Sequence, residues 1–161
     1  MTIKPFSGVE NFHFTDGIAT IKEKLSGMEF EEGERVFMGK RSKTIFVDDQ
    51  GLDITFKHDD GGIESFELSK KSSASFEGVR LFKTGMDALL EYFKARDQDI
   101  ELSDEVFFSK QLGIGIYSAG ASGKPGKKAK SVIVYDKAYL DQGLPSEEEI
   151  INYYLSLGKE S

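Results

Sequence analysis

The sequence predicts an α+β fold made of two tandem helix-plus-antiparallel-sheet units with an added C-terminal helix. Two observations predict it. The chain passes twice through the same order, which is a glycine–valine pair, an aromatic strand, a short amphipathic helix and a β-rich stretch. A further helical pattern near the end has no counterpart in the first half. The expected boundaries are 1–77 for the first unit, 78–141 for the second and 142–161 for the C-terminal helix.

Each unit is expected to contain a short helix after its first strand, because apolar residues recur there at helical spacing. In the first unit these residues are Ile18, Ile21 and Leu25. In the second unit they are Met86, Leu89, Leu90 and Phe93. Thr15 or Asp16 precedes the first helix and Thr84 precedes the second, and these residue types favour the N-cap position.

A β-rich stretch is expected after each helix. The expected strands are 35–38, 45–47, 52–56 and 63–68 in the first unit, and 112–117 and 131–135 in the second. Leu52, Ile54 and Phe56 alternate strictly with polar residues, which predicts a strand with one buried and one solvent-facing side. The sequence therefore predicts sheets that are covered on one face only.

The end of the chain is expected to form a cover over an exposed sheet edge or a core opening. Ser146 and Glu149 make a capping box in front of a helix predicted over 147–157. Its packing face would consist of Ile150, Ile151, Tyr154, Leu155 and Leu157.

Composition and charge limit the classes of function. The chain has 161 residues with 39% hydrophobic and 30% charged residues, which is typical of a globular protein. The absence of cysteine excludes thiol catalysis, iron–sulfur clusters and cysteine zinc sites. With a formal net charge of −7, nucleic acid and anionic membranes are poor partners and a basic protein is a suitable one. No apolar run approaches membrane-spanning length and the start lacks an apolar signal region, so we expect a cytoplasmic protein.

Four patterns invite a chemical interpretation, and each has a structural alternative that fits better. His58 with the following aspartates offers zinc ligands, but the glycines after them indicate a hairpin turn. His13 fits an exposed strand position. The segment 48–53 lacks the ligand spacing of a calcium loop, and 120–125 lacks the Ser or Thr and the helix of a phosphate-binding loop. We therefore predict a protein that is not an enzyme and that has no metal, cofactor or catalytic residues.

Five segments carry a resemblance to known proteins: 14–18, 51–56, 63–68, 76–82 and 112–117. Over residues 8–141 the chain resembles the tandem helix-plus-four-strand layout of the β-lactamase inhibitor protein and of small outer-membrane assembly lipoproteins. It also resembles uncharacterised bacterial proteins with that layout. The resemblance implies a protein-binding module, an inhibitor or immunity protein that neutralises a basic bacterial toxin. The alternative is a housekeeping or small-ligand-binding protein without catalytic activity.

The partner-binding surface is expected on the sheet face opposite the helices. Its predicted residues are Asp53, Thr55 and Lys57 in one half and Gly113, Gly115 and Tyr117 in the other, joined by Tyr135. Tyr117 and Tyr135 are the expected aromatic anchors, since tyrosine is enriched among residues that dominate binding energy. The alternative is that the two glycines accommodate sheet curvature and the two tyrosines are ordinary solvent-facing strand residues. Glu31 and Glu32 are expected at the rim, where their charge would speed association.

Overall fold

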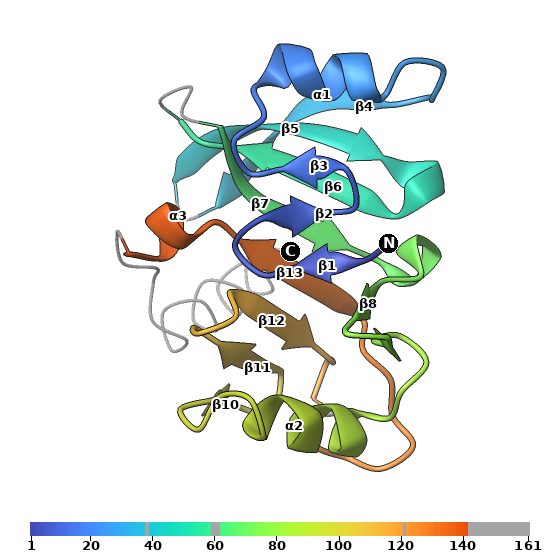
Figure 1. The fold of residues 1–161 in the computed structure, drawn as a ribbon, viewed down its shortest axis with the longest axis vertical. Helices are drawn as coiled ribbons and strands as arrows, with labels where there is room; N and C mark the ends of the chain where they lie inside the picture. Colours follow the sequence, from blue (N-terminus) through green and yellow to red (C-terminus); the bar gives the residue numbers. More distant parts are fainter. Residues whose placement is uncertain (38, 59–61, 121, 142–161) are drawn as a thin grey trace.

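The fold is mostly β, which corrects the expected α+β class. The computed structural model describes residues 1–37, 39–58, 62–120 and 122–141 (Figure 1). Within these residues the chain forms thirteen strands and three short α-helices. The helix predicted over 147–157 lies outside the described residues.

One antiparallel sheet of eight strands forms the body of the molecule. Its order is β10–β11–β12–β13–β7–β6–β5–β4. The bounds are β4 (Glu31–Phe37), β5 (Lys40–Val47), β6 (Leu52–Phe56), β7 (Ile63–Leu68), β10 (Glu101–Leu102), β11 (Val106–Ser109), β12 (Ile114–Tyr117) and β13 (Ser131–Tyr135).

The two halves of the chain share this sheet, because β13 pairs with β7. In that pairing Val134 lies opposite Phe66 and Val132 lies opposite Leu68. The expectation of two helix-plus-sheet units standing side by side is therefore wrong. The expected boundary between residues 77 and 78 falls in the turn of a small hairpin formed by β8 (Ser75–Phe76) and β9 (Val79–Arg80).

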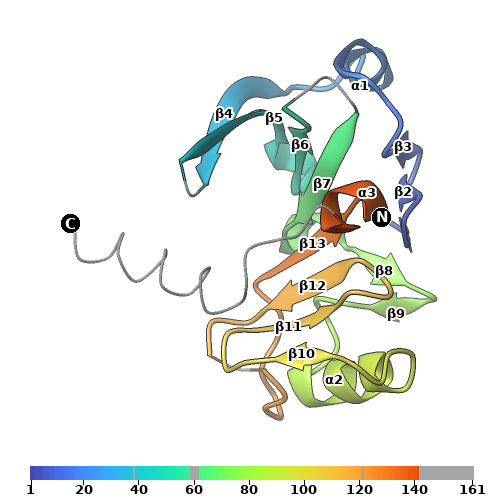
Figure 2. The same cartoon turned by 90° about the vertical axis from the view of Figure 1, so that its left-hand side faces the viewer.

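Smaller elements cover one face of the sheet. Figure 2 shows the sheet from the side, with α1 (Ile18–Lys24) and the N-terminal strands on its right and α2 (Met86–Lys94) at the bottom, next to β10. Those strands, β1 (Ile3–Lys4), β2 (Gly8–Val9) and β3 (Phe12–His13), form a three-stranded sheet of their own. A third helix, α3 (Lys137–Asp141), follows β13 directly.

The core lies between these covering elements and the large sheet. Helix α1 contributes Ile21 to it, and α2 contributes Met86, Leu89, Leu90 and Phe93. Phe93 is fully buried and packs against Phe107 of β11, with ring centroids 5.4 Å apart. The helical spacing predicted for both segments is confirmed, because their apolar residues face the sheet.

The predicted helix caps are wrong. Gly17 and Gly85 occupy the N-cap positions, and neither helix has a side-chain capping bond. The Asp16 carboxylate instead accepts a hydrogen bond from the His13 amide at 2.9 Å. The Thr84 hydroxyl donates to the Arg80 carbonyl at 2.8 Å. Each side chain therefore bonds within the turn that precedes its helix and does not accept a hydrogen bond from the first amides of the helix.

Candidate partner-binding face

The opposite face of the large sheet carries the side chains that alternate with the core residues, and we call it the open face. Two rows of residues cross it in register. The first row is Phe46, Asp53, Glu67, Ile133, Gly115 and Phe108. The second row is Thr44, Thr55, Ser65 and Tyr135. Both rows run from the first half of the chain into the second, across the β7–β13 pairing.

Five of the predicted partner-binding residues lie on the open face. They are Asp53, Thr55, Gly115, Tyr117 and Tyr135. Tyr117 is 41% exposed and lies opposite Ser131 at the end of β12. Thr55 is almost fully buried, and its hydroxyl lies 3.3 Å from that of Thr44. Thr55 is therefore part of the floor of the face, whereas Tyr117 is accessible to a partner.

Two other predicted residues, Gly113 and Lys57, are engaged within the fold. Gly113 is buried in the turn before β12 with φ of +67°, and a Cβ there would lie 2.8 Å from the Phe6 ring. Its lack of a side chain is required by the backbone and by Phe6, so it offers nothing to a partner. Lys57 follows the end of β6 and pairs with Asp136 at 2.5 Å, with most of its side chain covered.

The two predicted rim glutamates point in different directions. Glu31 is exposed and lies opposite Phe46, so it continues the first row of the open face. Glu32 is the next residue on the strand and therefore projects from the other side. Its carboxylate pairs with Lys22 of α1 at 2.5 Å. Only Glu31 lies at the rim of the open face.

Aromatic side chains gather at one end of the open face. Phe108 meets Tyr135 edge to face, with ring centroids 5.8 Å apart. Tyr135 in turn stacks on Tyr139 of α3 at 6.1 Å. Burial, together with the neighbouring carboxylate of Glu64, raises the pKa of the Tyr139 phenol to about 12. These ring contacts pack α3 against the sheet. They also leave the partly buried aromatic rings of the cluster on the open face.

Charged side chains gather at the other end. Asp53 and Glu67 lie opposite each other on neighbouring strands. Arg35 of β4 donates to the Asp53 carboxylate at 3.0 Å and also to that of Glu67. Burial raises the pKa of Asp53, with Glu67 and Asp48 adding to the rise and Arg35 opposing it. A pocket of about 380 Å³ adjoins these carboxylates and is also lined by Asp48, Lys71 and Ser131.

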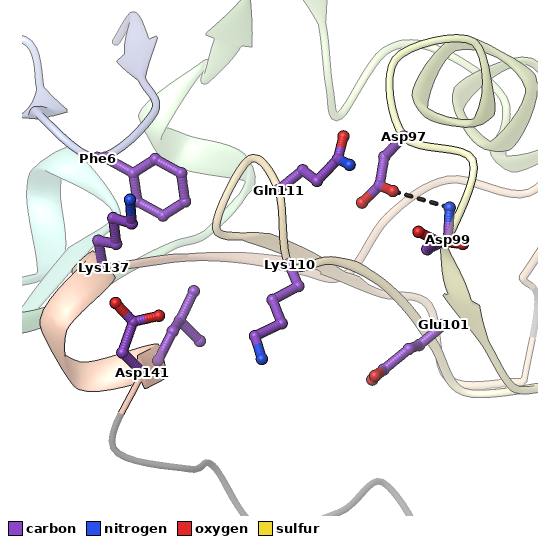
Figure 3. Close-up of a pocket in the computed structure, with 9 residues that line it drawn as sticks. Phe6, Asp97, Asp99, Glu101, Lys110, Gln111, Lys137 and Asp141 are labelled. Atoms are coloured by element: carbon purple, nitrogen blue, oxygen red, sulfur yellow. Dashed lines mark hydrogen bonds between the residues drawn. The ribbon is translucent and has the colours of Figure 1, made fainter.

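A second pocket of about 390 Å³ lies where α3 approaches β10 and the N-terminal segment (Figure 3). Asp97 is 1% exposed at its edge. One carboxylate oxygen accepts from the Asp99 amide and the other from the Ser109 hydroxyl, both at 2.8 Å. Both oxygens are therefore engaged in holding the chain after α2, and the carboxylate stabilises the fold there.

The histidines are not assembled into a site. His13 is exposed on β3, and a ring nitrogen of His58 lies 3.2 Å from the Arg41 carbonyl. The aspartates that follow His58 lie outside the described residues. Among the residues that the structure describes, no group of three or more His, Asp or Glu side chains could hold a metal ion.

Sequence reasoning missed the contributions of Arg35, Glu67 and Phe108. Alternation in the segment 63–68 would have placed Glu67 beside Asp53 once the two strands were paired. The strand that carries Phe108 was not predicted at all. Arg35 has no local signal, because its partners lie 18 and 32 residues away.

Comparison with known proteins adds information on the fold alone. No protein-family model matches the chain, and no curated protein is similar to it in sequence. A similar solved structure is that of the uncharacterised protein yfeY from Escherichia coli, with a TM-score of 0.56 and 16% identity. The similarity covers 81% of this chain and 97% of that chain, so the two proteins share a fold. Of the helices in the described residues, none is both long and apolar enough to cross a membrane.

Proposed function

We propose that the chain is a protein-binding module that recognises a basic protein through the open face. The observation that carries the proposal is the composition of that face. A solvent-facing tyrosine and a half-buried aromatic cluster lie at one end, and carboxylates lie at the other. Binding surfaces commonly combine aromatic anchors with charge that guides association.

The charge of the chain supports a basic partner. Its formal net charge is −7, and Glu31, Asp53 and Glu67 place three carboxylates along one row of the face or at its rim. A partner of opposite charge would be steered towards this row. Neutralisation of a basic bacterial toxin is the specific activity that we propose. The absence of cysteine suits the reducing cytoplasm, which is the compartment that we propose for it.

A comparison of three immobilised forms of the full chain tests the proposal. The forms are the wild type, the open-face variant Tyr117→Ala/Ile133→Ala and the control Glu91→Ala, whose residue is exposed on α2. Each is incubated with lysate of the native host, and retained proteins are identified by mass spectrometry. We expect a basic protein that the wild type and the control retain, that the open-face variant loses, and that salt releases.

The captured protein then tests neutralisation. It is expressed in the host alone, with the wild-type chain, or with the open-face variant. We expect growth arrest that the wild type relieves and the open-face variant does not. Normal growth with the captured protein alone would contradict neutralisation, and capture that is equal for all three forms would contradict binding through the open face.

A further inference from the structure

The hairpin of β4 and β5 extends beyond the rest of the sheet. All seven residues of β4 pair with β5, but β5 pairs with β6 only from Thr44 to Val47. Residues 34–37 and 40–43 therefore form a two-stranded extension, which we call the arm. In Figure 2 the β4–β5 hairpin curves towards the left, the side of the open face. A two-stranded ribbon without further pairing is marginally stable on its own.

Arg35 belongs to the arm, yet it contacts the floor of the open face. Glu31 shares a row with Asp53, and Arg35 lies four residues farther along β4. In a flat sheet Arg35 would be displaced from Asp53 by about 13 Å along the strand and about 10 Å across the strands. That separation exceeds the length of an arginine side chain. The 3.0 Å contact therefore requires the arm to fold back over the open face.

The two carboxylates form a site that already holds a guanidinium. Asp53 and Glu67 face each other across β6 and β7, and separate nitrogens of Arg35 donate to each. A planar guanidinium with several donors suits such a pair of carboxylates. The 380 Å³ pocket lined by the same two residues gives access from solvent.

The two ion pairs of Arg35 are partly exposed to solvent. Its side chain is 37% exposed, and those of Asp53 and Glu67 are 26% and 28% exposed. Ion pairs with this degree of exposure contribute little net stability. A second guanidinium delivered from solvent would meet the same two carboxylates and would compete with Arg35 for them.

We propose that Asp53 and Glu67 are a subsite for an arginine side chain of the partner, and that Arg35 occupies it when no partner is bound. This inference rests on the proposed binding function and names the chemistry of one contact. The arm then acts as an internal competitor. When the partner's arginine enters, Arg35 leaves and the arm swings away from the open face.

The probe is a capped triarginine peptide, titrated into isotope-labelled protein and followed by amide chemical shifts. A capped tricitrulline peptide is the neutral control. We expect Arg35→Gln to bind triarginine at least tenfold more tightly than the wild type, with the largest shifts on β6 and β7. Arg41→Gln is the matched control, because Arg41 lies on the same arm and pairs with Glu34 instead. It should bind as the wild type does, and Asp53→Asn/Glu67→Gln should not bind at all.

Binding by Arg35→Gln that is no tighter than binding by the wild type would overturn the inference. So would binding that persists in Asp53→Asn/Glu67→Gln, or equal binding of tricitrulline. Arg35→Lys keeps a cation with a poorer fit and should give intermediate affinity, so it replaces Arg35→Gln if that variant unfolds. A partner captured through Tyr117 and Ile133 but insensitive to Arg35 would leave the proposed function standing and remove this inference alone.

Discussion

Phe108 and Tyr135 meet edge to face across β12, with their ring planes at 90° and their centroids 5.8 Å apart. They come from β11 and β13, so the intervening strand must leave them room. Gly115 supplies that room, because a Cβ there would already lie 3.4 Å from the Phe108 ring. Gly115, one of the residues predicted for the partner-binding surface, thus makes room for the protein's own aromatic side chains.

Substitutions at Gly115 should show how tightly this cluster is packed. A single methyl group makes ordinary contact with Phe108, so Gly115→Ala should leave the free energy of unfolding almost unchanged. The branched side chain of Gly115→Val would push Phe108 from Tyr135 and should cost about 1–3 kcal/mol. Urea denaturation measures both variants. If both variants lost the same free energy of unfolding, the loss would come from the backbone at position 115 and not from a clash with the Phe108 ring.

Ionisation of Tyr139 should be delayed to about pH 12. Its raised pKa means that the native state holds the phenolic proton more tightly than the unfolded chain does. The resulting stabilisation is complete below about pH 10 and is lost as the pH rises through about 12. A near-ultraviolet absorbance titration should show a tyrosine ionisation step near pH 12 that Tyr139→Phe removes and Tyr117→Phe retains. Glu64→Gln should move that late step to lower pH.

The raised pKa of Asp53 predicts a pH-dependent effect of its replacement. Burial is the main cause, so the charged carboxylate costs stability above its native pKa, and this cost disappears below the unfolded value of 3.8. Asp53→Asn should therefore be at least as stable as the wild type at pH 7, with the difference vanishing below pH 3.8. Denaturation at both pH values measures this, and Asp49→Asn on the exposed turn is the control. If Asp53→Asn were less stable than the wild type at pH 7 only, the ion pair with Arg35 would stabilise the fold by more than burial of the carboxylate destabilises it.

Glu31 and Glu32 should differ in their effect on association with a captured partner. Glu31 lies at the rim of the open face, whereas Glu32 pairs with Lys22 on the helix side. Glu31→Gln should lower the association rate and weaken its dependence on salt, and Glu32→Gln should do neither. Stopped-flow or surface-binding kinetics at several salt concentrations provide the measurement. Equal effects would indicate steering by net charge rather than by this rim.

Local patterns predicted much of the secondary structure. The strands over 52–56, 63–68 and 131–135 are confirmed with the bounds that alternation and flanking turns indicated. Both helices begin where the apolar spacing begins, at Ile18 and Met86. These features depend on neighbours within a few residues, which is why the sequence reveals them.

The arrangement of the strands could not be predicted in the same way. Nothing local indicates that Val134 pairs with Phe66, and that pairing merges the expected two units into one sheet. The short strands of β10 and β11 carry mixed polar and aromatic residues without clear alternation. The fold-back of Arg35 onto Asp53 depends on the curvature of an entire hairpin. The open face could thus be predicted in part from alternation, and its closure by the arm could not.

The dissociation rate of a Tyr117 variant tests the central claim most directly. Tyr117 is a better position for this test than Tyr135. Tyr135 packs against Phe108 and Tyr139, so its removal would also disturb the fold. If the open face binds the partner, Tyr117→Ala should cost about 2 kcal/mol, which corresponds to dissociation about thirtyfold faster. Glu91→Ala on the far side should dissociate at the wild-type rate. An unchanged dissociation rate for Tyr117→Ala, with an intact circular dichroism spectrum and melting temperature, would contradict binding through the open face.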